Sequence, residues 1–412
     1  MSEVAQATHS SPDGHIPQLR FPGFSGVWRE NRLGNIARIF DGTHQTPKYV
    51  ENGIPFYSVE HITANQFDDT KYISEEVFER ENMRVKLERE DILMTRIGNI
   101  GMAKYIDWNV NASFYVSLAL IKKNESFNSK FLSQLIHSPN FQRQLWKRTI
   151  HVAFPQKINL GEIGKCESIL PTKPEQQKIA AFLTAVDNKI EQLSKKQELL
   201  GEYKKGLTQQ IFSQAIRFKA GDGSDFPDWE EKKLGDVFEI KAGQSKSKHI
   251  KKDGKNIIVD MGGISSEPKL VAKKLTDYDD DFLTTNDLVM PKDDIGGGLI
   301  IGKVAEIPEN NKYICGDHIY KLTVVNGNIT FLKYAINSYQ VNKSFRQKAN
   351  GTAQIGLSRK EVENQLLSFP SLKEQTKIAN FLSSIDSKIE QVGKQLNESK
   401  QFKKALLQQM FV

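Results

Sequence analysis

The sequence contains three stretches whose residue types could support catalysis or cofactor binding, but their spacing does not fit. The glycines at 296–298 and Gly302 are not followed by the Lys-Ser or Lys-Thr pair of a nucleotide-binding P-loop, so a turn or a close backbone approach is the simpler interpretation. Residues 227–232 superficially resemble a nuclease metal motif, but the acidic and Glu-x-Lys parts stand too close together. We interpret this segment as a turn with a buried Trp229, and the charged run at 277–281 as a solvated loop.

Metal-binding and methyltransferase motifs are also absent from the sequence. The two cysteines, Cys166 and Cys315, lie far apart, and no His/Cys cluster has zinc-ligand spacing. There is no Asn/Asp-Pro-Pro-Tyr/Phe motif of an amino-methyltransferase. We therefore predict no catalytic residue, no metal site and no disulfide, and the two separate cysteines favour a reducing compartment, the cytoplasm.

Two long apolar repeats organise the rest of the chain. In each repeat the steps between seam residues alternate between four and three, which is the pattern of a coiled-coil helix. Every position of the second repeat lies 199 residues after its counterpart, as Ile378 lies after Ile179. The apolar seam residues are Ile179, Leu183, Val186, Ile190, Leu193, Leu200, Leu207 and Ile211 in the first repeat, and Ile378, Leu382, Ile385, Ile389, Val392, Leu396, Leu406 and Met410 in the second.

The segments before the two helices repeat as well. Short β-type runs at 36–40, 55–59, 91–95 and 115–120 precede a helical stretch from 129 to 147, in which Ser138-Pro139 is expected to cap and begin a second helix. The second half has the same order and contains a capping-box pattern that starts at Ser358. The predicted organisation is a flexible tail (1–16), a first head (17–172), a central helix (173–218), a second head (219–371) and a C-terminal helix (372–412).

The expected fold class is α+β, with two globular α/β heads joined by two long antiparallel coiled-coil helices in a pseudo-twofold internal repeat. A long apolar seam is unstable in water, so the two matching seams are expected to pair within the chain. An antiparallel pair places each head near the start of its own helix, whereas a parallel pair would place both heads at one end. Polar residues at Gln197, Lys204, Ser399 and Lys403 interrupt the seams; they either specify the register or mark frayed or partner-contacting parts.

Length and composition set wider bounds. The chain has 412 residues, 38% hydrophobic and 26% charged, which suits a soluble protein with several cores. No apolar run approaches the ~18 residues of a membrane span, and the N-terminal stretch shows no secretory signal, so no membrane partner is expected. The net charge of +7 is compatible with a polyanionic partner, although many unrelated proteins share it.

This arrangement resembles the specificity subunit of type I restriction-modification systems. The segment from Pro174 to Glu191 is similar to the start of the central spacer helix of that family, and residues 41–47 and 91–98 are similar to segments of its target-recognition domains. The resemblance covers the chain from about Phe21 to Val412, and the helices carry its most specific part.

The resemblance implies a non-catalytic subunit that binds double-stranded DNA. Each head would bind one half of a bipartite target, and the helices would set the gap between the halves. Two methyltransferase subunits and two restriction subunits would be the protein partners. The resemblance implies that this chain binds no cofactor, whereas the partner subunits use S-adenosylmethionine, ATP and Mg²⁺.

The residues that would contact DNA are sought in polar, turn-flanked loops, because such side chains can hydrogen-bond to base edges. In the second head, a loop displaced by 201 positions from Thr43 begins at Gln244, and its basic residues could instead form a solvated surface. The candidates in the first head are Thr43, His44, Gln45, Thr46, Lys48, Arg96, Asn99, Gln156 and Lys157. Those in the second head are Gln244, Ser245, Lys246, Lys248, Lys292, Thr352 and Gln354.

Two other classes of function remain open from the sequence. One is a non-enzymatic coiled-coil scaffold whose heads bind proteins, and the other is an enzyme with an unrecognised site. Retention on duplex DNA would separate the first of these from a DNA-binding subunit.

Overall fold

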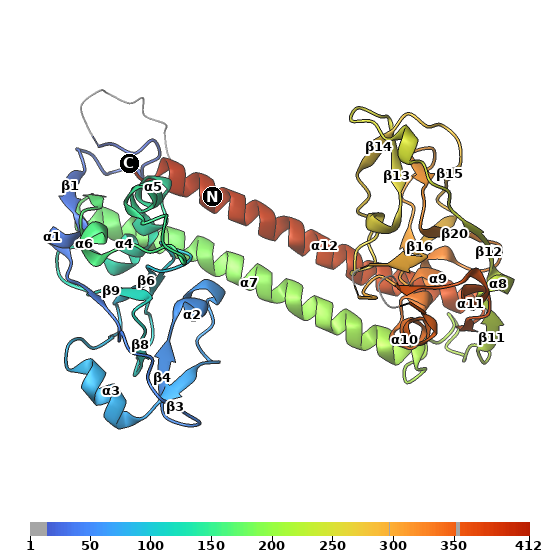
Figure 1. The fold of residues 1–412 in the computed structure, drawn as a ribbon, viewed down its shortest axis with the longest axis horizontal. Helices are drawn as coiled ribbons and strands as arrows, with labels where there is room; N and C mark the ends of the chain where they lie inside the picture. Colours follow the sequence, from blue (N-terminus) through green and yellow to red (C-terminus); the bar gives the residue numbers. More distant parts are fainter. Residues whose placement is uncertain (1–14, 296, 352–354) are drawn as a thin grey trace. The chain divides into compact units, whose positions relative to one another are not determined.

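The computed structural model describes residues 15–295, 297–351 and 355–412, and contacts divide the chain into two units (Figure 1). The first unit comprises Met1–Lys195 with Gly393–Val412, and the second comprises Lys196–Val392. Each long helix therefore contributes to both units. The predicted tail lies outside the described residues, except for His15 and Ile16.

The two long helices are α7 (Lys173–Phe212) and α12 (Leu372–Gln409). In the first unit, Asp187 of α7 is ion-paired with Lys403 of α12. In the second unit, Lys204 of α7 is ion-paired with Asp386 of α12. Residue numbers thus rise along one helix as they fall along the other, and the helices are antiparallel, as predicted. Both pairs follow the same register, because their residue numbers have the same sum.

The seam positions face the interior of the units. Each apolar and polar seam residue named above is buried or half-buried, while most of the charged residues of α7 and α12 are exposed. Burial of an apolar stripe is the main source of stability for helices of this length in water. The polar seam residues Lys204 and Lys403 take part in the two ion pairs that join the helices.

The globular part of the first unit contains two four-stranded sheets and one two-stranded sheet. Their strand orders are β2-β9-β6-β7, β3-β5-β4-β8 and β1-β10, and the pairs are antiparallel except for β4 with β8. The strands are β1 (Arg29–Arg32), β2 (Ile39–Asp41), β3 (Tyr49–Val50), β4 (Ile54–Tyr57), β5 (Lys71–Ile73), β6 (Ile92–Thr95), β7 (Ala103–Tyr105), β8 (Ser113–Phe114), β9 (Leu118–Ile121) and β10 (Glu167–Leu170). The helices are α1 (Leu33–Ile36), α2 (Val59–Ala64), α3 (Glu75–Asn82), α4 (Ser129–Ile136), α5 (Pro139–Arg148) and α6 (Leu160–Gly164).

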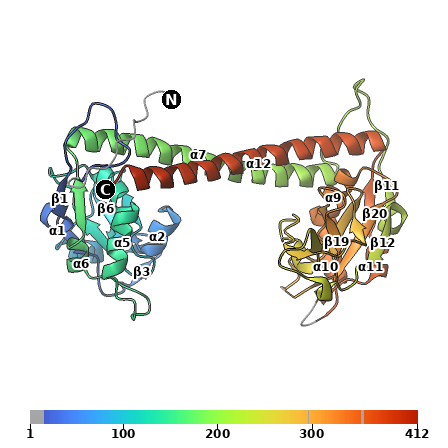
Figure 2. The same ribbon diagram turned by 90° about the horizontal axis from the view of Figure 1, so that it is seen from above.

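The second unit repeats this plan (Figure 2). Its strand orders are β12-β20-β16-β18, β14-β13-β19-β15, β11-β22 and β17-β21. The strands are β11 (Glu230–Lys233), β12 (Phe238–Ala242), β13 (Asn256–Val259), β14 (Lys274–Thr276), β15 (Phe282–Leu283), β16 (Asp287–Pro291), β17 (Asp293–Asp294), β18 (Ala305–Glu306), β19 (Tyr313–Cys315), β20 (Ile319–Val324), β21 (Ile355–Gly356) and β22 (Leu366–Phe369). The helices are α8 (Leu234–Val237), α9 (Ile329–Ile336), α10 (Tyr339–Lys348) and α11 (Arg359–Glu363), with short 3-10 turns at Ser247–His249 and Met261–Gly263.

Local capping explains where the short helices begin. The Ser138 hydroxyl accepts a hydrogen bond from the amide of Phe141, and Pro139 begins α5, as predicted. The predicted capping box at Ser358 is also present at the start of α11. Three predicted strand runs have different bounds, because Ile36 belongs to the helical turn α1, Val59 begins α2, and β9 begins only at Leu118.

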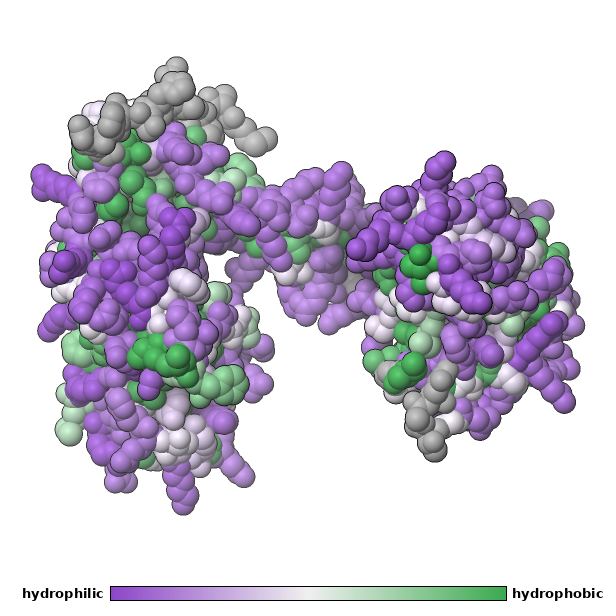
Figure 3. Space-filling model, turned by 45° about the horizontal axis from the view of Figure 1, so that its top comes forward, coloured by the Kyte–Doolittle hydropathy of each residue, from purple (hydrophilic) through white to green (hydrophobic). Residues whose placement is uncertain are grey.

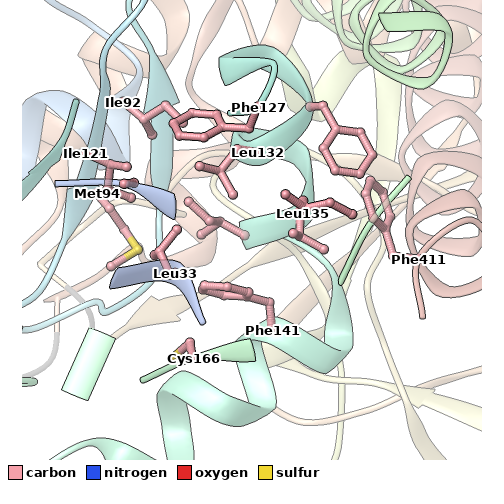
Figure 4. Close-up of a cluster of buried hydrophobic side chains, with 14 of the residues drawn as sticks. Leu33, Ile92, Met94, Ile121, Phe127, Leu132, Leu135, Phe141, Cys166 and Phe411 are labelled. Carbon is pink, nitrogen blue, oxygen red and sulfur yellow. The ribbon is translucent and has the colours of Figure 1, made fainter. Parts of the chain in front are cut away.

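Each unit has one large apolar core that joins the head to both long helices. In the first unit, Phe411, just after the end of α12, packs edge-on against Trp28 and lies 5.4 Å from the ring of Phe131. Figure 4 shows Phe411 in the same cluster as Leu135 and Phe141. In the second unit, Phe331 and Leu382 share a core with Ile211 near the end of α7. Trp229 is half-buried rather than buried, and its indole donates to Glu374.

The Glu-Gln pair at the start of each long helix holds the head. Glu175 is buried and accepts two hydrogen bonds of 2.7 Å from Arg20, and Glu374 is paired in the same way with Arg217. The adjacent Gln176 accepts from the amide of Asn128 and donates to the carbonyl of Pro171. Gln375 makes the equivalent two bonds in the second unit. The repeated sequence therefore encodes a repeated junction. Among the described residues, no helix has the length and apolar content needed to cross a membrane.

Candidate nucleic-acid interface

In the first head, the predicted loop at 43–48 begins where the backbone at Gly42 and Thr43 crosses closely over the backbone at Phe114. Thr43 donates its amide to the carbonyl of Phe114 and accepts from the amide of Val116. A Cβ at Gly42 would lie only 2.0 Å from the Phe114 carbonyl oxygen, so this crossing requires glycine. The loop that follows is thereby held at a defined place, and its residues His44, Gln45, Thr46 and Lys48 are exposed.

Arg96, a predicted contact residue, is largely buried next to this loop. Its side chain is 8% exposed and donates to the carbonyls of Val116 (2.8 Å) and Ile158 (3.1 Å). Its guanidinium lies 3.8 Å from Asp41. Arg96 therefore joins the segments that carry Asp41, Val116 and Ile158, and its contact with DNA stays a prediction. Burial lowers the pKa of Arg96, and the charge of Asp41 partly opposes this.

Asp41 is part of the same network. Its carboxylate accepts a hydrogen bond from Arg84, which also donates to the Asp41 backbone carbonyl, and lies 2.9 Å from Nε2 of His44. Although burial acts to raise the pKa of Asp41, the bonds and charges of Arg84 and His44 outweigh it and hold the pKa below the ordinary value. The His44 ring is thus oriented from below by a carboxylate, while most of its surface remains exposed.

The loop that carries Gln156 and Lys157 is tied to the same end of the head. The Gln156 carbonyl accepts from the amide of Gly98, and the Ile158 amide donates to the carbonyl of Arg96. Asn99, next to Gly98, is exposed, as are Gln156 and Lys157. The structure therefore brings the three predicted segments of the first head together around Arg96.

The second head has the same backbone arrangement, built from other residues. A Cβ at Gly243 would lie 1.8 Å from the carbonyl oxygen of Gly316, so the crossing found at Gly42 recurs there. Lys292 occupies the place of Arg96: its amide donates to the carbonyl of His318, and its carbonyl accepts from Leu357. The corresponding bonds of Arg96 reach Ser117 and Ile158.

Lys246, a predicted contact residue, is also largely buried, and its contact with DNA stays a prediction. Its side chain is 7% exposed, lies 3.4 Å from Asp281 and stacks its ammonium 4.9 Å from the ring of Tyr278. It therefore holds the 244–249 loop against its own head. Gln244, Ser245 and Lys248 are exposed, and Lys292 is half-buried. Two further predicted residues, Thr352 and Gln354, lie outside the described residues.

Groups that could hold a metal or act as nucleophiles were also sought. In the described ranges, no three His, Cys, Asp or Glu side chains are grouped as metal ligands. Cys166 and Cys315 are buried and unpaired, and burial raises the pKa of Cys166 to about 11 and that of Cys315 to about 12. A thiol protonated at neutral pH is a poor nucleophile and metal ligand.

Sequence reasoning missed several residues that build this surface. Asp41 and Arg84 orient the first loop, and Gly42 and Gly243 permit the crossings. The glycines could have been noticed from their equal place before the two polar loops. The pairing of Asp41 with Arg84 gave no local signal, because the residues are far apart in sequence.

Comparisons with known proteins agree with the repeated plan. The family model described as the type I restriction modification DNA specificity domain matches this chain twice, at residues 26–200 and 227–400. Two proteins of Methanocaldococcus jannaschii are similar over most of their length. The putative type I restriction enzyme MjaX specificity subunit is 25% identical over 409 residues, which cover 92% of each chain. The type I restriction enzyme MjaVIII specificity subunit is 28% identical over 407 residues, which cover 92% of this chain and 91% of that protein.

Two solved structures share the fold. The S subunit of a type I restriction-modification system from M. genitalium matches with a TM-score of 0.65 at 15% identity, over 96% of this chain and 99% of that one. A chain from a study of the assembly and conformational transition of the type I R-M system matches with a TM-score of 0.52 at 15% identity, over 92% and 96%.

Proposed function

This chain belongs to the family of type I restriction-modification specificity subunits, and we propose that each of its heads reads one half of a bipartite target in double-stranded DNA. The observation that carries this proposal is the equivalent backbone arrangement that holds a polar loop in each head. Gly42 with Arg96, and Gly243 with Lys292, hold polar loops at the same place in the two heads, and the loops differ in sequence. Two domains with the same backbone arrangement but different exposed side chains are suited to bind two different base sequences.

The long helices would set the unspecified gap between the two half-sites. A helix has a fixed rise of about 1.5 Å per residue, so a pair of helices in fixed register gives a fixed separation. The two ion pairs, Asp187 with Lys403 and Lys204 with Asp386, support this role because both keep one register. The same helices would dock the partner subunits.

We further propose that the chain itself catalyses nothing and binds no cofactor. Two methyltransferase subunits would assemble on it and use S-adenosylmethionine, and two restriction subunits would use ATP and Mg²⁺. The proposal places the complex in the cytoplasm, where it would meet DNA. The buried, protonated thiols and the residues that hold the polar loops, already engaged in backbone bonds, support a binding rather than a chemical role.

The test is a selection of bound duplexes from a randomised library by the full-length chain, alone or with its methyltransferase partner. We expect two short sequence elements separated by a constant gap. Gln45→Ala, in the loop of the first head, is expected to relax the choice of base in one element. Gln244→Ala, in the corresponding loop of the second head, is expected to relax it in the other element. Enrichment of no sequence, or an effect of both substitutions on the same element, would contradict the assignment of one half-site to each head.

A further inference from the structure

The tip of one loop in the first head exposes two large apolar side chains completely. Val152 is 97% exposed and Phe154 is 103% exposed, which makes them the most exposed large apolar side chains of the described part of the chain. Hydrophilic side chains dominate the face of the molecule drawn in Figure 3, with apolar ones scattered among them. An exposed Phe at a loop tip contributes nothing to the core of its own domain, which points to a role in binding another molecule.

The loop that presents Phe154 is closed tightly at its base. The amide of Ile150 donates to the carbonyl of Lys157 at 2.8 Å, and the amide of Gly98 donates to the carbonyl of Gln156 at 2.8 Å. On the near side of the tip, His151 packs 4.8 Å from the ring of Trp146 and bonds its backbone carbonyl. The tip therefore stands on a fixed base, which limits the backbone entropy that the loop loses on binding a ligand.

The segment of the sequence that carries this tip is basic, which favours a polyanion over a protein surface of mixed charge. Residues 126–161 contain no Asp or Glu, but they contain Lys130, Arg143, Lys147, Arg148 and Lys157. Arg143, Lys147 and Lys157 are exposed. Side chains of this sign bind phosphates, and an aromatic group interleaved with them binds bases.

We propose that Phe154 inserts between two stacked base pairs at the half-site read by the first head, with Val152 packed beside it. This inference rests on the proposed function. Apolar side chains such as Phe are inserted between base steps by many DNA-binding proteins, and they kink the duplex while basic neighbours hold its backbone. Gln156 and Lys157 follow Phe154 on the same loop, so base reading and insertion occur at nearby positions.

The insertion is specific to the first head. The base of the equivalent loop is closed in the same way, since Asn350 and Gly356 exchange both of their backbone hydrogen bonds. However, the sequence between these two residues contains no aromatic side chain. Unstacking of the DNA is therefore expected at one half-site only.

The experiment uses the full chain and a 40-base-pair duplex with the sequence enriched in the selection described above, and 2-aminopurine is placed at each adenine position in turn. Binding of the wild type is expected to raise 2-aminopurine fluorescence several-fold at one step of the first half-site. Phe154→Ala should abolish that rise and weaken binding about tenfold or more, since it removes the burial of one Phe side chain. Phe154→Leu should retain much of the rise, because Leu also acts as an apolar wedge.

Tyr339→Ala provides the matched control, because Tyr339 is 67% exposed and lies in the second head outside the predicted DNA-contact loops. It is expected to change neither affinity nor fluorescence. Tight and specific binding by the wild type with no fluorescence rise at any position would overturn the insertion and leave the proposed function intact. Loss of a copurifying methyltransferase subunit in Phe154→Ala with unchanged DNA binding would assign the tip to a protein partner instead. Enrichment of no DNA sequence would contradict the proposed function itself.

Discussion

Lys403 of α12 and Asp187 of α7 form an ion pair of 2.5 Å at a half-buried seam position. The other oxygen of Asp187 accepts a hydrogen bond of 2.7 Å from Gln134 of the first head. The second unit repeats the arrangement, in which Asp386 accepts from Lys204 and from Tyr334. One aspartate in each unit therefore joins both long helices and the adjacent head, so the register of the helices and the attachment of the head depend on the same side chain.

Replacement of Lys403 by Ala should lower the free energy of unfolding by about 1 kcal/mol, because a half-buried carboxylate loses its charged partner. Urea denaturation followed by circular dichroism measures this difference. Lys404→Ala is the control, because Lys404 is an exposed neighbour on the same helix and should change the value by less than about 0.5 kcal/mol. Equal effects of the two substitutions would show that the ion pair adds no stability.

Deletion of one heptad from both helices should shorten the gap in the DNA target. Removal of 189–195 together with 388–394 keeps both ion pairs in a common register, because each deletion lies between the paired positions of its helix. The helices become about 10 Å shorter, which corresponds to about three base pairs. Selection of bound duplexes, or sequencing of methylated sites, should give unchanged half-sites with a shorter gap.

Deletion of 189–195 alone provides the comparison. It leaves the two ion pairs in registers that differ by seven residues, so the helices cannot form both. Loss of assembly is expected for the single deletion. An unchanged gap in the double deletion would contradict the role of the helices as the spacer.

We expect the free energy of unfolding of the first unit to decrease when the pH is lowered below about 6.5, because His137 then titrates differently in the folded and the unfolded chain. Burial, together with the charge of Lys403, lowers the pKa of His137, although its bond to the Ala103 carbonyl and the charge of Asp187 act in the opposite direction. The unfolded chain then binds more protons than the folded one, so the free energy of unfolding decreases as pH falls through and below the ordinary His value of about 6.5. The slope contributed by one group is at most about 1.4 kcal/mol per pH unit.

His137→Asn should remove this contribution, because Asn337 occupies the equivalent position in the second unit and bonds the Val304 carbonyl at the same distance of 2.9 Å. Urea unfolding at pH 7.5 and pH 5.5 should show a smaller loss for the variant than for the wild type. His151→Asn, at an exposed position, controls for the chemistry of the substitution. Equal losses of unfolding free energy between pH 7.5 and pH 5.5 in His137→Asn and in the wild type would contradict the role of the His137 ring in this pH dependence.

Replacement of Lys246 should affect stability, whereas replacement of Lys248, only two residues away, should affect DNA binding. Lys246→Ala removes the ion pair of a buried ammonium with the half-buried Asp281 and a contact with Tyr278, so it should lower the free energy of unfolding by about 1–3 kcal/mol. Lys248→Ala, at an exposed position, should leave stability unchanged, weaken DNA binding and reduce the dependence of the binding constant on salt by about one ion. Thermal unfolding and DNA titrations at several salt concentrations measure the two effects. A salt dependence that Lys248→Ala leaves unaltered would exclude Lys248 from the phosphate contacts.

Much of the fold could be predicted because its signals are local or periodic. The seam from Ile179 to Ile211 and its copy predicted two helices of nearly the observed length, and Ser138 and Ser358 marked helix starts through their own backbone bonds. The strands were less well bounded, since Leu33–Ile36 and Leu234–Val237 are single helical turns too short to show a period. Short turns depend on the neighbouring β1 and β11 segments that they connect, and not on their own sequence alone.

The sequence by itself determined the duplication, the two long helices and the polar loops of each head, because these follow from spacing along the chain, whereas the ion pairs of the structure decided that the helices are antiparallel. Only the tertiary structure decided which cations of those loops face solvent. Arg96 and Lys246 have the same types and local surroundings as surface residues, yet one meets the carbonyls of Val116 and Ile158 and the other meets Asp281. A charged side chain is buried where remote groups satisfy it, and the position of remote groups is set by the fold and not by sequence spacing.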